Sequence, residues 1–254
     1  MTSAAHPAAP LSRRAALTAG ALAAATVALG RTRAAADIPG ESNGGVRIMP
    51  LGDSLTDGFT PYPGGYRVVL WQLLAADGTA VDFVGSLANG PAELGDHDHE
   101  GHSGWRIDQL DTGIDAWLTA TAPHTVLLLI GTNDLNQNHD VPHAPARLSA
   151  LIDRIRARRP DAEIFVATVP PQENATQQAR VVAYNAAIPG VVAGKDNRVH
   201  LVPMYDALTT ADLADGIHPT RAGYGKMAAV WHDALRSVPT ALAPHAAHTA
   251  AARP

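Results

Sequence analysis

The sequence predicts a three-layer α/β/α sandwich around a five-stranded parallel sheet. Short apolar runs alternate with segments of helical periodicity, and the runs are continuously apolar rather than alternating in polarity. A strand that is apolar on both faces, such as 126–130, is expected where helices cover both faces of a parallel sheet. In such a fold the functional crevice lies at the carboxyl ends of the strands.

Five runs rich in apolar and β-branched residues predict the strands. They cover residues 46–51, 81–84, 125–130, 163–169 and 198–202. Five segments between and after them show the periodicity of amphipathic helices. They cover residues 66–76, 107–121, 144–158, 176–192 and 221–236. No internal repeat interrupts this order, so we expect one domain over residues 45–237.

The N-terminal end has the composition of an export signal. Arg13 and Arg14 precede an Ala/Leu-rich stretch, and an A-x-A cleavage pattern ends at Ala36. Residues 1–36 are therefore predicted to be a twin-arginine-type signal peptide, followed by a short linker over 37–44, and we expect a secreted, extracellular protein. An uncleaved membrane anchor is the alternative, but about 16 small residues are short for a span.

The C-terminal end, residues 238–254, is rich in Ala, His and Pro and has no apolar periodicity, so it is predicted to be disordered. The chain has no cysteine, which excludes disulfides, thiol catalysis and thiolate metal sites. Removing residues 1–36 would remove four arginines and leave 15 basic against 24 acidic side chains. This excludes nucleic acid and stable membrane association as expected partners, and we expect a monomer acting on a neutral substrate.

A first motif, Gly-Asp-Ser-Leu at 52–55, follows the first predicted strand. Gly52 and Gly58 give the backbone freedom to turn sharply, which would bring a substrate carbonyl close to the hydroxyl of Ser54. We predict that Ser54 is a nucleophile. The alternative is a serine that caps the next helix or lines an anion-binding turn.

A second motif supplies a base. His218 differs from the other eleven histidines because an acid, Asp215, stands three residues before it and Pro219 directly after it. Proline favours an extended backbone at the residue before it and can begin a helix. Asp215 can then orient one ring nitrogen while the other faces Ser54. The alternative is a turn in which Asp215 only caps the helix.

A third motif, Gly-Thr-Asn-Asp at 131–134, follows the most apolar strand. The carboxamide of Asn133 is predicted to donate to a developing oxyanion at the floor of the crevice. The alternative is an asparagine that hydrogen-bonds its own turn. Ser54, Asn133 and His218 are all predicted to lie on one rim of the sheet.

With these motifs the chain resembles the SGNH (GDSL) hydrolase superfamily, which has a flavodoxin-like α/β/α fold. Ser54, Asn133 and the Asp215–His218 pair match its first, third and last blocks, and Gly104 in His-Ser-Gly-Trp at 102–105 matches the second. The resemblance implies a Ser54–His218–Asp215 triad. It also implies an oxyanion hole formed by the amides of Ser54 and Gly104 and the side chain of Asn133.

Gly101 and Gly95 compete with Gly104 for the second block. The segments 49–54, 64–67, 81–86 and 100–106 look closest to carbohydrate esterase family 3, the acetylxylan esterases. This resemblance implies a serine esterase that needs no cofactor and hydrolyses acetyl esters on a polysaccharide through an acyl-enzyme. A lipase or lysophospholipase of the same superfamily is the first alternative. A non-catalytic flavodoxin-like module, with the first loop as a phosphate nest, is the second.

The polar run 96–102 contains three histidines and three acidic residues, but its spacing fits no zinc or EF-hand pattern. We therefore predict a polar loop beside the site and no metal site, with a structural cation as the alternative. Asp53, His102 and Trp105 are predicted to contact the substrate, although apolar packing would also explain the tryptophan.

Overall fold

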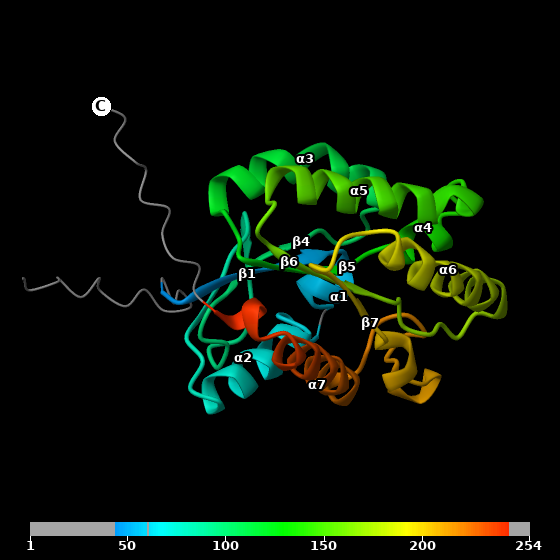
Figure 1. Cartoon of the computed structure of the whole chain (residues 1–254). Helices are drawn as coiled ribbons and strands as arrows, with labels where there is room; N and C mark the ends of the chain where they lie inside the picture. Colours follow the sequence, from blue (N-terminus) through cyan, green and yellow to red (C-terminus); the bar gives the residue numbers. More distant parts are fainter. Residues whose placement is uncertain (1–43, 60, 244–254) are drawn as a thin grey trace, which may run out of the picture. The chain divides into compact units, whose positions relative to one another are not determined.

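The computed structural model of the chain describes residues 44–59 and 61–243 (Figure 1). The predicted signal peptide and most of the predicted linker lie outside these residues. A central sheet is covered on one face by α2 (Tyr66–Ala76) and α7 (Arg221–Ser237). The other face is covered by α3 (Ile107–Thr121), α5 (Ala144–Arg158) and α6 (Ala175–Ala193). The predicted three-layer α/β/α sandwich is confirmed.

The sheet has seven strands. They are β1 (Val46–Gly52), β2 (Val81–Phe83), β3 (Leu87–Ala88), β4 (Asp98–Gly101), β5 (Thr125–Leu129), β6 (Glu163–Ala167) and β7 (Val199–Val202). The order is β3-β4-β1-β5-β6-β7, and β2 also pairs with β1. All pairs are parallel except β3 with β4. The five predicted strands are all present, and each predicted helix is found within a residue of its expected bounds.

Two one-turn helices follow the central strands and carry two of the predicted functional residues, Ser54 and Asn133. The first, α1 (Ser54–Asp57), begins after β1, and the second, α4 (Thr132–Asn136), begins after β5. Gly52 pairs with Leu129, so both strands end at the same level of the sheet. The order of strands alone therefore brings Ser54 and Asn133 to one edge, as parallel pairing predicts.

The predicted polar loop over 96–102 contains a strand. The sheet therefore has seven strands and not the five predicted. Residues Asp98–Gly101 form β4, which pairs in parallel with the end of β1, and the short β3 pairs with it. The apolar pattern did not indicate this strand because the buried side chains in the run are polar. Asp96, His99 and Glu100 are at most 1% exposed.

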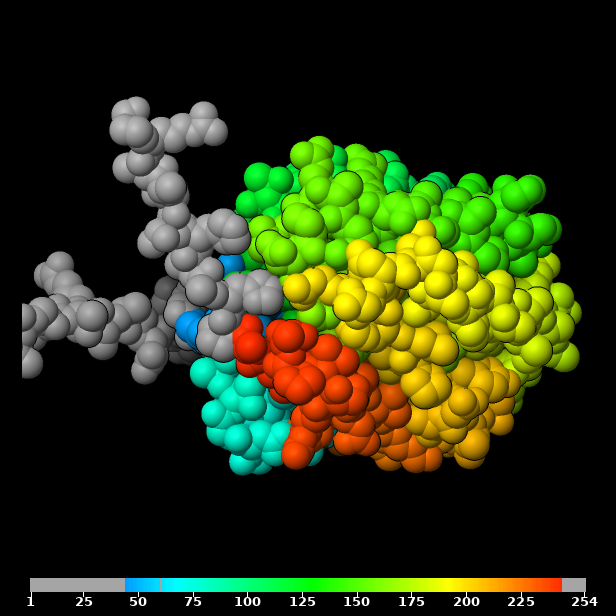
Figure 2. Space-filling view, in the orientation of Figure 1, coloured from blue at the N-terminus to red at the C-terminus, as the bar shows by residue number. Residues whose placement is uncertain are grey.

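The prediction that disorder begins at residue 238 is also wrong. A 3₁₀ helix, η4 (Pro239–Leu242), follows α7 and buries Ala241. Thr125 donates its hydroxyl to the Ala241 carbonyl at 2.7 Å, and Thr240 donates to a Glu163 carboxylate oxygen at 2.8 Å. These contacts close the amino ends of β5 and β6, and in Figure 2 the segment (red) continues the surface formed by α2 (cyan) and α7. The rest of the tail lies outside the described residues.

The described residues include no helix whose length and apolar character would suit it to cross a membrane.

Shortening the chain tests the new C-terminal boundary. A protein ending at Ser237 loses the two side-chain hydrogen bonds to Thr125 and Glu163 and the burial of Ala241. It should therefore be less stable by about 2 to 4 kcal/mol. The matched control ends at Ala243 and keeps every described contact of η4. Urea unfolding of the two proteins measures the difference. Equal midpoints would show that η4 adds nothing to the stability of the domain.

Candidate active site

Three side chains form a continuous hydrogen-bonded chain at the predicted rim. The Ser54 hydroxyl lies 2.8 Å from Nε2 of His218. On the other side of the ring, Nδ1 of His218 lies 2.8 Å from Oδ2 of Asp215. The structure therefore brings the Ser54 hydroxyl to the His218–Asp215 pair, although Ser54 and His218 are 164 positions apart in the chain.

The loop that carries the base is held by its own carboxylate. Oδ1 of Asp215 accepts hydrogen bonds from the backbone N–H groups of Ile217 and His218, at 3.0 and 2.7 Å. Partial burial acts to raise the pKa of the Asp215 carboxyl, but the hydrogen bonds from His218 and Ile217 prevail and lower it. Asp215 is thus kept as an anion while it orients the imidazole.

Phe59 supports the imidazole from the side. Its ring stacks on that of His218 with centroids 4.2 Å apart and planes 8° apart. The Phe59 backbone N–H donates to the hydroxyl of Tyr224, from α7, at 3.2 Å. The sequence does not predict this contact, since no motif relates an aromatic residue at 59 to a histidine at 218.

The amide of Asn133 faces the loop between β4 and α3. Its Nδ2 donates to the carbonyl of Trp105 at 3.0 Å and lies 3.4 Å from Oδ2 of Asp53. An amide NH₂ carries two protons. One proton is donated to the Trp105 carbonyl and the other, over a longer distance, to Asp53, so a ligand would have to replace the weaker bond to Asp53.

Gly104 lies at the tip of this same loop with φ +82°, a conformation that favours glycine. Its carbonyl accepts from Nε2 of Gln137 at 3.0 Å. The two competing glycines are engaged elsewhere. The Gly101 amide donates to Nδ1 of His99 within β4, and Gly95 lies against the indole of Trp71. Gly104 therefore fits the donor position better than either competitor.

The chain is similar in sequence to a known family of hydrolases. Residues 51–226 match the model of the GDSL-like lipase/acylhydrolase family. The chain belongs to that family. It is also 32% identical over 217 residues to a multidomain esterase from Ruminococcus flavefaciens, an alignment that covers 74% of this chain. The chain spans only 28% of the length of that relative.

Solved structures agree with the family model. A family 3 carbohydrate esterase from Clostridium thermocellum is 38% identical, with a TM-score of 0.72, and the alignment covers 79% of this chain and all of that one. A family 3 carbohydrate esterase from Talaromyces cellulolyticus is 29% identical, with a TM-score of 0.68, over 76% of this chain and 97% of that one. The predicted resemblance to SGNH hydrolases, and among them to carbohydrate esterase family 3, is thereby confirmed.

In this GDSL family member Asp53 is not placed to contact a substrate, so that prediction is wrong. The side chain is fully buried behind Ser54, and Oδ1 accepts from the backbone N–H of Leu55 at 3.0 Å, which caps α1. Burial raises the pKa of the Asp53 carboxyl to about 7, and the nearby Asp134 carboxylate acts in the same direction. The hydrogen bond from Leu55 opposes both effects without cancelling them.

His102 is held by a stack of aromatic rings. Its ring lies 4.1 Å from that of Trp105 and 4.8 Å from that of Trp117, and Nε2 lies 2.7 Å from Oε1 of the buried Glu100. Only 12% of the His102 side chain is exposed. Both His102 and Trp105 are therefore held by internal packing. Their contact with a substrate stays a prediction.

The polar run 96–102 is used for internal hydrogen bonding. Glu100 accepts from both the backbone N–H and the hydroxyl of Ser86, each at 2.7 Å. Burial lowers the pKa of His99 to about 2, so this ring is neutral. Within residues 44–59 and 61–243, no cluster of three or more His, Cys, Asp or Glu side chains is arranged to hold a metal ion.

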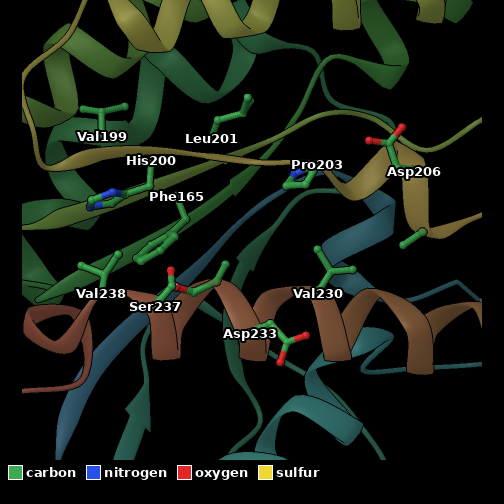
Figure 3. Close-up of a pocket in the computed structure, with 12 residues that line it drawn as sticks. Phe165, Val199, His200, Leu201, Pro203, Asp206, Val230, Asp233, Ser237 and Val238 are labelled. Carbon is green, nitrogen blue, oxygen red and sulfur yellow. The ribbon is translucent and has the colours of Figure 1, made fainter.

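A groove of ≈ 740 Å³ lies between β7 and α7 (Figure 3). Apolar side chains such as Leu201 and Val230 line it, with the carboxylates of Asp206 and Asp233 at its borders. None of the triad residues lines this groove, so its volume says nothing about the chemistry at Ser54.

The raised pKa of Asp53 predicts a pH-dependent stability that Asp53→Asn should remove. An unfolded Asp ionises near pH 4, whereas folded Asp53 keeps its proton to about pH 7. The folded state therefore binds more protons between these values, and the stability of the wild type should fall as the pH rises through this window. Asparagine does not titrate.

Urea unfolding of both proteins at pH 4.5 and at pH 7.5 measures the effect. The stability of the wild type relative to Asp53→Asn should decline by an amount on the order of a few kcal/mol between the two conditions. Curves for the two proteins that run parallel would show that Asp53 is ionised in the folded state throughout.

Proposed function

We propose that this protein is a secreted serine esterase that removes acetyl groups from a polysaccharide such as xylan. The observation that carries the proposal is the hydrogen-bonded chain from the Ser54 hydroxyl through His218 to Asp215, with 2.8 Å at each step. The relatives named as esterases and as family 3 carbohydrate esterases support the choice of ester hydrolysis and of a carbohydrate substrate.

In the first step the Ser54 oxygen attacks the carbonyl carbon of the acetyl ester. Nε2 of His218 accepts the hydroxyl proton, and the Asp215 carboxylate stabilises the imidazolium that forms. The negative charge moves to the former carbonyl oxygen, where Nδ2 of Asn133 and the amides of Ser54 and Gly104 would donate to it. When the C–O bond to the sugar breaks, His218 returns its proton to the departing sugar hydroxyl.

In the second step water attacks the acetyl group on Ser54. His218 now takes a proton from that water, the same donors stabilise the second tetrahedral intermediate, and acetate leaves as Ser54 regains its proton. Phe59 keeps the imidazole in one orientation through both steps, because its ring is stacked flat against that of His218.

The surface beside the triad supports a hydroxyl-rich leaving group. A hollow of ≈ 290 Å³ adjoins the catalytic loop and is lined by Glu173, Asn174 and Gln177 together with residues 215–217. Carboxylate and amide groups bind sugar hydroxyls, whereas a long acyl chain would require an apolar surface. Of the triad only Asp215 lines this hollow, so it supports the glycan as a polar surface that a polymer could reach beyond the ester bond.

Replacing the proposed catalytic groups tests the mechanism. Ser54→Ala and His218→Ala should each lower kcat by about 10⁴- to 10⁶-fold, because each removes an essential part of one proton-transfer unit. Asn133→Ala should lower kcat by about 10²- to 10³-fold, as expected for one oxyanion donor. Acetate release from acetylated xylan measures all three, with Tm as the check that each variant is folded.

The same assay separates the alternatives. Acetylated pectin, acetylated chitin oligomers and esters of longer acyl chains serve as comparison substrates, and activity should be highest on acetyl esters of a glycan. Activity that rises with acyl chain length would favour the lipase. Full activity in Ser54→Ala, or no labelling of Ser54 by a fluorophosphonate in the folded protein, would contradict the nucleophile.

Export is part of the proposal and rests on Arg13 and Arg14 before the Ala/Leu-rich stretch. Replacing both arginines by lysine keeps the charge and should block the twin-arginine route, leaving the protein inside the producing cell. Immunoblots of medium and cell fractions measure the distribution. Undiminished secretion of the double variant would exclude a twin-arginine signal.

A further inference from the structure

The tip of the loop between β4 and α3 is not held in place by packing. Two backbone bonds form its base, from His102 N–H to the Gly52 carbonyl at 2.9 Å and from Trp105 N–H to the His102 carbonyl at 3.1 Å. Ser103 and Gly104 are exposed, and a Cβ built on Gly104 would have no heavy atom within 4 Å. Aromatic packing holds His102 and Trp105 at the two ends of the tip. The placement of Ser103 and Gly104 between them depends further on hydrogen bonds.

Two side-chain bonds meet at this tip, and they lead to the two helices that carry the other proposed oxyanion donors. The Ser103 hydroxyl donates to Oδ2 of Asp57 at 2.5 Å. Asp57 is the last residue of α1, whose first residue is Ser54. From the other side, Gln137 donates to the Gly104 carbonyl at 3.0 Å and is the C-cap of α4, which carries Asn133.

Asp57 is itself fixed by Asn89 and by the buried Arg67. Its other carboxylate oxygen accepts from the side-chain amide of Asn89, and its carbonyl accepts from Arg67 at 3.2 Å. Arg67 is fully buried and also donates to the carbonyls of Thr56 and His97. Asp57 is therefore a rigid anchor, and its charge is already part of a hydrogen-bonded network before Ser103 joins it.

An oxyanion donor must lie within about 2.7 to 3.1 Å of the developing charge, so a loop that drifts by a few tenths of an ångström loses much of its effect. A hydrogen bond to a carboxylate oxygen is stronger than one between two neutral groups. The Ser103–Asp57 bond is strong enough to restrict an exposed tip that packing leaves free.

We propose that Ser103 and Asp57 are positioning residues, whose hydrogen bond holds the amide of Gly104 in register with the Ser54 hydroxyl. The inference rests on the proposed function, because it assigns a role to these residues only if Gly104 stabilises an oxyanion. The Ser103–Asp57 bond should stabilise the transition state and leave substrate binding unchanged, since neither residue is among the groups that bind or attack the ester.

The test compares Ser103→Ala with Ser103→Thr. The alanine variant loses the hydroxyl and should lower kcat about tenfold, part of the effect of removing one oxyanion donor outright, while KM changes less than about twofold. Threonine keeps the hydroxyl and should recover kcat to within about threefold of wild type. The rate of Ser54 labelling by a fluorophosphonate should fall in parallel, because that reaction also develops charge on an oxygen in the hole.

Thr112→Ala is the matched control. Thr112 is likewise exposed and donates its hydroxyl to a carbonyl, that of Gln109, at 2.7 Å, but it lies within α3 and outside the site. It should leave kcat and KM unchanged. Tm should stay within about 2 °C of wild type in all three variants, because the bonds of Ser103 and Thr112 are exposed and exposed bonds add little to the stability of the fold.

Wild-type kcat in Ser103→Ala would overturn the inference and leave the proposed function intact, provided that Ser54→Ala is still inactive. A fall in kcat that threonine does not restore, or that follows Tm, would also overturn it, since the loss would then be structural. Absence of ester hydrolysis in the wild type would instead refute the proposed function itself.

Discussion

The parallel pairing of β1 with β5 is the constraint on which the site depends. It sets Gly52 opposite Leu129, so α1 and α4 begin at the same level of the sheet. The strands approach so closely that a Cβ on Gly52 would lie 2.2 Å from the Leu129 carbonyl oxygen. Only glycine fits there, and this close approach brings the Ser54 hydroxyl and the Asn133 amide to one edge.

The sequence was most informative where a feature is local or repeats along the chain. The five parallel strands were predictable because consecutive residues such as Val126 and Leu127, which point to opposite faces of the sheet, are both apolar. The pair Asp215 and His218 was predictable because one short loop carries both groups and their contact. The fold and the candidate triad therefore followed from hydrophobic pattern and motif spacing without any knowledge of long-range contacts.

What the sequence did not predict depends on burial, which residue type alone does not reveal. Asp53 was expected at the substrate, but its side chain is fully buried under α1, where an aspartate is rarely found. The strand β4 was hidden because Glu100 and its neighbours are polar, and the helix η4 because residues 239–242 lack periodicity. Phe59 was missed because its partner, His218, is distant in sequence.

The surroundings of the loop between β4 and α3 show how a chain without cysteine can fix an exposed loop. Three buried polar groups surround it. Arg67 of α2 donates to the His97 carbonyl, Glu100 accepts from the backbone N–H of Ser86, and His99 accepts from the nearby Gly101 N–H. Buried charges are costly unless every partner is present, so such a network stabilises one arrangement and disfavours partly formed ones. The loop that carries Gly104 begins directly after Glu100 and Gly101, at the border of this network. A rigid polar base can therefore hold in place a loop tip that has almost no packing of its own.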